Sequence, residues 1–238
     1  MARMRLARVM ILRSLVTSRR QAESLIKLGA VKINNRIIID PNSLVNDSDR
    51  IEIETAERYV SRAALKLASV VSKMKLEFRD KRVLDVGSST GGFTDYALQH
   101  GAKSVVAIDA GTKQLHTKLR KHPKVELHEK TDIRDFKTNQ QFDMILVDVS
   151  FISLRKVLPH IATLASDGTD ILVMVKPQFE TYGSVQKNMG IIKNDRIRRE
   201  ILKEFEAWAK SRFVVRAKAD SEILGSKGNR ERFYLLSK

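Results

Sequence analysis

Hydrophobic and polar positions alternate in a regular pattern from residue 81 onward. Short apolar runs recur along the chain, and helical or loop segments of suitable length separate them. Short strands that alternate with helices are typical of a mostly parallel sheet with helices on both faces, so the pattern predicts an α/β fold. We expect strands at 82–86, 104–109, 124–128, 144–150 and 170–175, and a terminal hairpin at 212–219 and 232–237 on an edge of the sheet.

The N-terminal segment follows a different pattern. Ser18 and Gln21 have the spacing of a helix capping box, and the apolar residues after them fall on one helical face. Gly29 stands where a glycine ends a helix. The pattern therefore predicts a short helix that begins after Ser18.

A small sheet is predicted after this helix. The segments 30–33 and 36–39 have strand character, and the Asn34–Asn35 pair between them tolerates the left-handed backbone of a tight hairpin turn. A third strand falls near 50–54. We therefore predict a unit of two helices and a small sheet at the N-terminus.

These patterns divide the chain into two domains. We place the N-terminal unit at 1–56, a linker at 57–62 and the larger domain at 63–238. The first helix of the larger domain is expected to take Ser61 as its cap and to run to about Leu76.

Composition narrows the classes of function. The chain has 238 residues with 44 Lys and Arg against 28 Asp and Glu, a net charge of +16 that favours nucleic acid or another anionic partner. It has no cysteine, which excludes a disulfide framework, a thiolate zinc site and a cysteine nucleophile. Because we find no signal peptide and no apolar run long enough to span a membrane, we expect a soluble, cytoplasmic protein.

Positive charge is concentrated in the first 32 residues, which hold eight Lys or Arg against the single acid Glu23. The run "SRRQAESLIKLGAVKINNR" resembles the small RNA-binding module of a small-subunit ribosomal protein, of pseudouridine synthases and of a bacterial tyrosyl-tRNA synthetase. The resemblance implies that this unit binds RNA. The side chains that we assign to RNA binding are Arg5, Arg19, Arg20, Lys27, Lys32 and Arg36.

The stretch "VLDVGSSTGGFTD", residues 83–95, predicts a ligand-binding loop between a strand and a helix. It lacks the G-x-G-x-x-G of a dinucleotide site and the Gly-Lys-Ser/Thr of a nucleoside-triphosphate loop. Asp85 ends its strand, and Asp109 ends the next one, where one carboxylate can accept hydrogen bonds from two ribose hydroxyls. A ligand with a ribose, no pyrophosphate and a charged amino-acid tail fits these features, which favours S-adenosylmethionine.

We expect the glycine and small polar residues of this loop to lie around the methionine end of that cofactor. Asp109 is expected on the ribose, and Asp132 is placed to accept from the adenine amino group. The full set is Asp85, Gly87, Ser88, Ser89, Thr90, Gly91, Gly92, Phe93, Asp109 and Asp132.

Four charged residues mark a second group of candidates. Asp148 and Lys176 end two strands that are apolar enough to be buried, and strand ends at the carboxyl edge of an α/β sheet face the active crevice. Lys66 lies on the helix before the sheet, and Glu231 precedes the last strand. An alternative for these two is a solvated helix lysine and a surface ion pair.

Six segments, in order and spacing, are similar to the TlyA family, often called hemolysin A, of bacterial rRNA 2′-O-methyltransferases. They are "RYVSRAALKL", "VLDVGSSTGGFTD", "IDAGTKQLHTKLR", "DVSFISL", "VKPQFE" and "GNRERF". The resemblance covers nearly the whole chain. It implies a Rossmann-like class I methyltransferase domain of the FtsJ type, S-adenosylmethionine as the cofactor, and no metal.

The resemblance also implies the reaction and the partner. The expected reaction is methylation of cytidine 2′-hydroxyls in 23S rRNA, with 16S rRNA as a second candidate, so ribosomal RNA or ribosomal subunits are the expected partner. The catalytic tetrad of the family falls on Lys66, Asp148, Lys176 and Glu231. In this interpretation Lys176 orients the 2′-hydroxyl and either accepts its proton or stabilises negative charge on its oxygen, while Asp148 fixes Lys176 and Glu231 orients Lys66.

Two other classes of function remain open. A ribosome-associated RNA-binding protein without catalytic activity would account for the charge and the N-terminal unit. A membrane-acting cytolysin is suggested by the older family name, although no segment has the character of an amphipathic helix that lies in a membrane interface.

Overall fold

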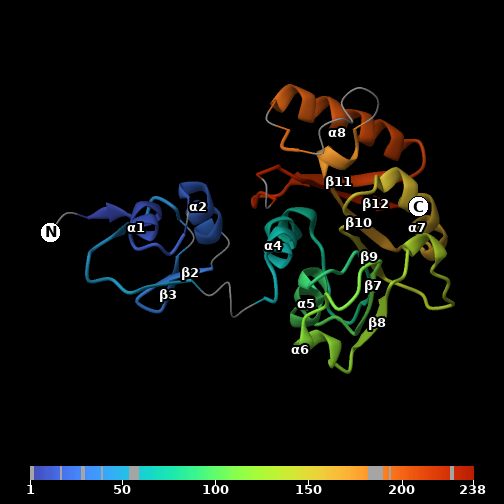
Figure 1. Ribbon diagram of the computed structural model, residues 1–238, viewed down its shortest axis with the longest axis horizontal. Helices are drawn as coiled ribbons and strands as arrows, with labels where there is room; N and C mark the ends of the chain where they lie inside the picture. Colours follow the sequence, from blue (N-terminus) through green and yellow to red (C-terminus); the bar gives the residue numbers. More distant parts are fainter. Residues whose placement is uncertain are drawn as a thin grey trace.

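The computed structural model describes residues 3–16, 18–27, 30–38, 40–53, 59–181, 190–192, 194–225 and 228–238. Within these ranges the side chains of Arg20, Ser24 and Lys27 are left out. Figure 1 shows two units, a small one at the N-terminus and a larger one that contains the main sheet. Residues 54–58, which connect them, lie outside the described ranges.

The N-terminal unit contains two helices and short strands, as the pattern predicts. Its elements are β1 (Met4–Arg5), α1 (Leu6–Leu12), α2 (Arg19–Lys27), β2 (Val31–Ile33), β3 (Arg36–Ile38), β4 (Leu44–Val45) and β5 (Ile51–Ile53). The predicted hairpin is β2–β3, with β5 on the other side of β2, and both Asn34 and Asn35 have positive φ. Ser18 Oγ accepts the Gln21 N–H at 3.2 Å, which is the predicted cap. The expected stop at Gly29 lies outside the described residues.

The larger unit alternates strands and helices along the chain. Its elements are α4 (Arg62–Met74), β6 (Arg82–Val86), α5 (Gly92–Gln99), β7 (Ser104–Asp109), α6 (Thr117–Arg120), β8 (Val125–Glu129), η1 (Ile133–Asp135), β9 (Met144–Val147), α7 (Leu154–Leu164), β10 (Asp170–Val175), η2 (Pro177–Phe179), α8 (Asp195–Lys210), β11 (Val214–Asp220) and β12 (Arg232–Ser237).

The seven strands of this unit form one sheet in the order β11-β12-β10-β9-β6-β7-β8. The neighbours from β10 to β8 pair in parallel, and β12 pairs antiparallel with both β10 and β11. The predicted terminal hairpin is therefore present. Its second strand, β12, lies inside the sheet and its first strand, β11, forms the edge.

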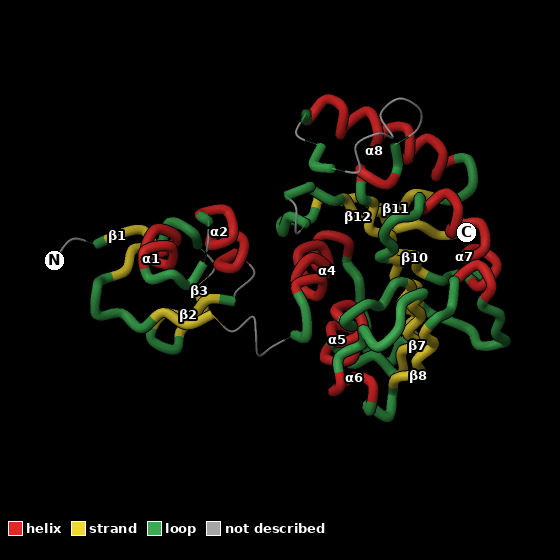
Figure 2. Tube along the Cα trace, in the orientation of Figure 1, coloured by secondary structure: helices red, strands yellow, loops and turns green. Residues whose placement is uncertain are grey.

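Helices cover both faces of the sheet, as Figure 2 shows. Met144 and Leu146 of β9 belong to the core that contains α4 and α5, whereas Ile145 and Val147 belong to the core that contains α7 and α8. This alternation follows from the two-residue period of a strand. A strand buried on both faces has apolar residues in succession, which is why these strands appear as continuous apolar runs.

The helix before the sheet differs from its prediction at its start. α4 begins at Arg62 with Ser61 in the N-cap position, but the Ser61 side chain makes no capping hydrogen bond. The Ser61 hydroxyl oxygen is instead buried against Gly92 at the start of α5, where a Cβ added to Gly92 would lie 2.3 Å from it. Burial between α4 and α5 turns this hydroxyl away from the helix end.

Candidate active site

Two largely buried ion pairs lie at the carboxyl ends of the parallel strands. Lys176 Nζ lies 2.6 Å from Asp148 Oδ1, and Lys66 Nζ lies 2.6 Å from Glu231 Oε2. Asp148 and Lys176 directly follow β9 and β10, which are neighbours in the sheet. Lys66 comes from α4, and Glu231 precedes β12. The fold thus brings together four residues that are far apart in the sequence.

The four charges act on one another. Burial raises the pKa of Asp148, and the positive charges of Lys176 and Lys66 oppose that shift. Burial also raises the pKa of Glu231. The positive charges of Lys66 and Lys176 oppose this shift, and the negative charge of Asp148 adds to it. A buried carboxylate that loses its lysine would be left as an uncompensated charge, which is strongly destabilising. Each pair therefore depends on both of its members.

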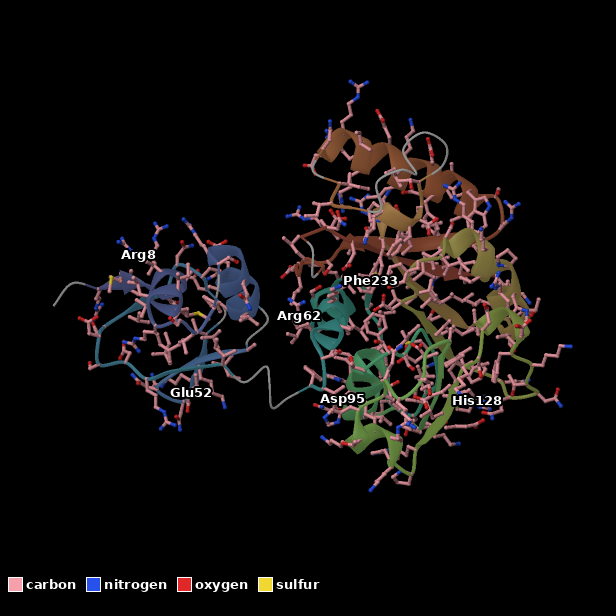
Figure 3. The ribbon with its side chains drawn as sticks, in the orientation of Figure 1. Arg8, Glu52, Arg62, Asp95, His128 and Phe233 are labelled. Carbon is pink, nitrogen blue, oxygen red and sulfur yellow. The ribbon has the colours of Figure 1, made fainter. Side chains whose placement is uncertain are left out.

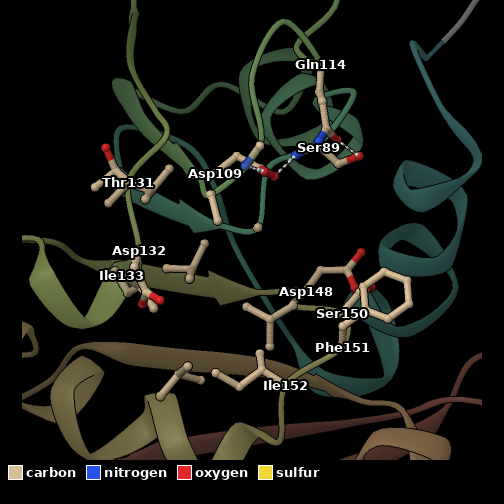
Figure 4. Close-up of a pocket in the computed structure, with 17 residues that line it drawn as sticks. Ser89, Asp109, Gln114, Thr131, Asp132, Ile133, Asp148, Ser150, Phe151 and Ile152 are labelled. Atoms are coloured by element: carbon tan, nitrogen blue, oxygen red, sulfur yellow. Dashed lines mark hydrogen bonds between the residues drawn. The ribbon is translucent and has the colours of Figure 1, made fainter. Parts of the chain in front are cut away.

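The residues after Asp148 extend the site toward solvent. Lys176 Nζ donates a hydrogen bond to Ser150 Oγ at 2.7 Å. Phe151 has a φ of +66°, which is unusual for a bulky residue, and its side chain is 83% exposed. Its ring centroid lies 5.3 Å from that of Phe179. Backbone strain of this kind is found most often at functional sites. Figure 4 shows Phe151 beside Ser150 and Asp148.

A cavity of about 380 Å³ opens along the ends of β6, β7 and β9. Five of the predicted site residues line it, and they are Gly87, Ser89, Asp109, Asp132 and Asp148. Gly87 has a φ of +82°, and a Cβ at this position would lie 2.6 Å from the carbonyl oxygen of Asp148. Only glycine allows the loop after β6 to approach the end of β9 so closely.

Asp109 holds the rim of this cavity in place. Its Oδ2 accepts the Ser89 N–H at 2.7 Å, and its Oδ1 accepts the Gly111 N–H at 2.6 Å. Ser89 Oγ also donates to the side chain of Gln114, as the dashed lines in Figure 4 show. Each carboxylate oxygen has a second lone pair. Asp109 can therefore bind a hydroxyl group while it orders the loop.

Asp132 also lines the cavity, and its carboxylate is hydrogen-bonded to Arg134. The Arg134 guanidinium donates to both carboxylate oxygens, at 2.9 and 2.6 Å. Hydrogen bonds from the Arg134 side chain and backbone lower the pKa of Asp132 to about 2. The predicted contact with an adenine amino group would have to share these oxygens with Arg134.

Asp85 is the most unusual carboxyl group of the site. It is buried, and its Oδ2 accepts a hydrogen bond from Thr94 Oγ1 at 2.6 Å. Its Oδ1 has no hydrogen-bond partner within the part of the chain that the structure describes. Burial raises the pKa of Asp85 to about 7, against the hydrogen bond from Thr94. A buried acceptor without a partner is costly, so this oxygen is suited to a cationic ligand group.

Two hydroxyl groups are also unpartnered among the described residues. Ser88 Oγ and Ser61 Oγ are both buried without a hydrogen bond. The amino-acid end of S-adenosylmethionine carries an ammonium group and a carboxylate. A carboxylate oxygen can accept from the ammonium group, and free hydroxyl groups can donate to the carboxylate. The donor set therefore fits this cofactor, and Asp85, Ser88 and Ser61 would hold its charged end.

The remaining loop residues have other positions. Thr90 is exposed, and its carbonyl oxygen accepts the His116 N–H at 3.2 Å. Gly91, with a φ of +95°, and Gly92 form the start of α5. The ring of Phe93 is buried 6.1 Å from that of Phe233, which Figure 3 labels. Phe93 thus packs in the core.

Sequence reasoning missed three residues of the site. Ser61 was expected only as a helix cap. Phe151 has a positive φ, which no sequence pattern indicates. Glu180 ends the "VKPQFE" segment but was not among the predicted site residues. Glu180 is buried and accepts hydrogen bonds from Ser153 Oγ and Leu154 N–H, both at 2.6 Å. It therefore joins the segment after β10 to the start of α7.

The N-terminal unit has a basic concave surface of its own. Arg3, Arg5, Arg8 and Arg19 line a hollow of about 540 Å³ together with Pro41 and Leu44. Figure 3 shows Arg8 at the surface of this unit. Lys32 and Arg36 lie on the β2–β3 hairpin. The side chains of Arg20 and Lys27 lie outside the described part of the structure.

Two further observations concern the described residues alone. They contain no group of three or more His, Cys, Asp or Glu side chains that could hold a metal ion. None of their helices combines the length and the apolar character that crossing a bilayer requires.

Comparisons with known proteins agree with this geometry. The family model of the S4 domain matches residues 4–51, and that of the FtsJ-like methyltransferases matches residues 59–238. The 23S rRNA (cytidine-2′-O)-methyltransferase TlyA of Campylobacter jejuni is 40% identical over 193 residues, which cover 80% of this chain and 75% of that protein. The 16S/23S rRNA (cytidine-2′-O)-methyltransferase TlyA of Mycobacterium tuberculosis is 39% identical over 191 residues, with coverages of 78% and 71%.

A solved structure extends the likeness to the whole chain. A putative hemolysin from Streptococcus thermophilus has a TM-score of 0.72 at 34% identity, and the match covers 100% of this chain and 89% of that one. The matches span both the N-terminal unit and the larger domain. The chain therefore belongs to the TlyA group of FtsJ-like methyltransferases.

Proposed function

We propose that the protein methylates the 2′-hydroxyl of a cytidine in 23S ribosomal RNA with S-adenosylmethionine as the methyl donor. The observation that carries this proposal is the pair of buried lysine–carboxylate contacts beside the cavity, at 2.6 Å each. The names of the TlyA relatives support a cytidine ribose in rRNA as the substrate. A ribosomal substrate also supports a cytoplasmic location for the reaction.

The cofactor supplies a methyl group on a positively charged sulfur, which is open to in-line attack. The residues of the chain then have to hold the 2′-oxygen at the correct distance and direction. Lys176 is suited to this task because Asp148 and Ser150 fix its Nζ at the edge of the cavity. Its N–H groups can donate to the 2′-oxygen and stabilise the negative charge that develops there.

The second pair supports the first. Glu231 holds Lys66 in an ion pair. The positive charge of Lys66 lowers the pKa of Asp148, and the negative charge of Asp148 raises the pKa of Glu231. Lys66 thus adds positive potential where the hydroxyl oxygen becomes more negative. The proton of the hydroxyl leaves through Lys176 or through solvent, and the proposal does not depend on which route is used.

The exposed ring of Phe151 is suited to the target base. An aromatic face beside a catalytic lysine can stack against an unpaired nucleobase, which RNA-binding proteins use widely. Phe179 packs against this ring. The N-terminal unit would bind the phosphate backbone through the arginine residues of its hollow.

The test is methyl transfer to isolated ribosomal subunits. Purified protein is incubated with 30S or 50S subunits and tritiated S-adenosylmethionine, and the label is mapped by primer extension at limiting nucleotide. Label on a cytidine ribose of 50S supports the proposal, and label on 30S as well makes 16S rRNA a second substrate. No label on either subunit, with cofactor binding intact, would contradict it and favour a non-catalytic RNA-binding role.

A further inference from the structure

The carboxylate of Glu231 packs against a single glycine. Glu231 is 3% exposed, and its Oε2 contacts Lys66. A Cβ at Gly225 would lie 2.8 Å from the other oxygen, Oε1. Two non-bonded atoms of this kind do not approach so closely, so a side chain at residue 225 would force the carboxylate to move.

The backbone of Gly225 does not itself require glycine. Its φ lies outside the left-handed region, and its N–H donates to the Asn229 carbonyl oxygen at 2.8 Å. Its own carbonyl oxygen accepts the Gly228 N–H at 2.8 Å. The reason for glycine at this position is therefore the space that Glu231 occupies.

The segment 228–231 is held in place from α8 and from residues 190–192. The buried Asn229 side chain accepts the Ile192 N–H at 2.8 Å and donates to the Gly190 carbonyl oxygen at 3.3 Å. Arg198 Nε of α8 donates to the Arg230 carbonyl oxygen at 2.9 Å. With these contacts the segment cannot shift to accommodate an added methyl group without breaking hydrogen bonds.

We propose that Gly225 is a positioning residue for the methyl transfer reaction, because its lack of a side chain lets Glu231 reach Lys66. The inference rests on the proposed function. An alanine at residue 225 would turn the carboxylate away from Lys66 and leave that lysine without its buried partner.

The experiment compares Gly225→Ala with Gly190→Ala. A Cβ at Gly190 would meet no atom of the described residues within 4 Å, and its φ is also outside the left-handed region, so it is a matched control. We expect Gly225→Ala to lower kcat on 50S subunits about 10- to 100-fold, with KM values for both substrates within about twofold of wild type. Gly190→Ala should turn over at the wild-type rate. Wild-type kcat for Gly225→Ala would overturn the proposal.

A double-mutant cycle with Glu231→Ala separates positioning from general damage. Removal of the carboxylate frees the space, so Gly225→Ala should change neither kcat nor the melting temperature further in that background. In the wild-type background it should lower the melting temperature. Equal effects in the two backgrounds would overturn the proposal. The melting-temperature measurement does not require turnover. It therefore still tests the contact between Gly225 and Glu231 if the wild-type protein methylates neither subunit.

Discussion

At the scale of single residues, the site depends on charges that are buried in pairs. Lys176 contacts Asp148 and Ser150, and Lys66 contacts Glu231. Buried charges need partners. In the sequence, Asp148 and Lys176 stand out because each follows an apolar strand that is expected to be buried. The contacts themselves depend on the strand order, which periodicity does not determine.

Replacement of Lys176 by alanine should remove the group that holds the 2′-oxygen. We expect kcat to fall by at least about 100-fold, because donors aimed at developing charge contribute on this scale. RNA affinity should stay within about twofold of wild type. Single-turnover methylation and filter binding on the same RNA measure the two quantities.

Lys156→Ala is the control for this prediction, since Lys156 is an exposed lysine on the neighbouring helix α7. It should react at the wild-type rate. A Lys176→Ala variant that is as active as Lys156→Ala would show that Lys176 does not act on the hydroxyl.

Asp85 should make the stability of the protein depend on pH. Its pKa is raised to about 7, above the ordinary value of 3.8. Between these values the folded state binds more protons than the unfolded state, so the free energy of unfolding decreases as the pH rises. The slope from this group is at most about 1.4 kcal/mol per pH unit.

Asp85→Asn should flatten this dependence. We expect the melting temperature of the cofactor-free variant to fall less than that of wild type between pH 5 and pH 8. Asp148, Glu180 and Glu231 also have raised pKa values, so the difference between the two proteins is the quantity to compare. Parallel curves for the two proteins would place the pKa of Asp85 near its ordinary value.

At the scale of elements, the strands of the larger domain and its first helix agree with the sequence pattern, although β9 ends at Val147 where a strand to residue 150 was expected. The structure confirms the α/β class and the mostly parallel sheet, and the comparisons confirm the family. β12 lies between β10 and β11, and this position depends on pairing between residues distant in the sequence. The two-residue strands β1 and β4 escape prediction because so short a segment has no period.

The start of α7 depends on a residue that follows a different strand. Glu180 accepts the Leu154 N–H, which is one of the amide groups that a helix leaves without an intrahelical partner. Local rules for helix caps consider neighbours in the sequence, so they identify Ser153 but not Glu180. The contact that ties α7 to the site therefore has no signal in the local sequence.

Glu180→Ala should therefore destabilise the protein. The change leaves the Leu154 N–H and the Ser153 hydroxyl buried beside a small cavity, and an unsatisfied buried group costs about 1–3 kcal/mol. Urea unfolding measures the loss. Glu204→Ala, at an exposed position of α8, should change the free energy of unfolding by less than about 0.5 kcal/mol. Equal losses for the two variants would mean that Glu180 is not an anchor for α7.

At the scale of the whole molecule, the charge of +16 indicates an interaction with a polyanion. The S4 match over residues 4–51 includes Arg5, Arg8 and Arg19, three of the four arginine residues that line the N-terminal hollow. The placement of this unit within the chain was predictable from charge and pattern. The hollow was not, because it is formed by α1, α2 and the segment near Leu44 together.

The N-terminal hollow should bind phosphate groups. RNA affinity should fall linearly with the logarithm of salt concentration, and Arg8→Ala should reduce the magnitude of that slope by about 0.7 to 0.9, as expected for the loss of one phosphate contact. Lys203→Ala on α8 is the control of equal charge change. Binding titrations at several salt concentrations measure the slopes. If the slopes for Arg8→Ala and the wild-type protein are equal, Arg8 does not contact the RNA.

The contact between Lys66 and Glu231 has a consequence for folding. It joins the first helix of the domain to the residue before β12, the last strand of the chain, which lies between β10 and the edge strand β11. Contacts between such distant residues form slowly, because a long loop has to close first. The β6–β7 region, which carries the residues assigned to the cofactor, is built from nearer neighbours. During refolding, cofactor affinity should return before methyl transfer, and turnover would report the completion of the native state.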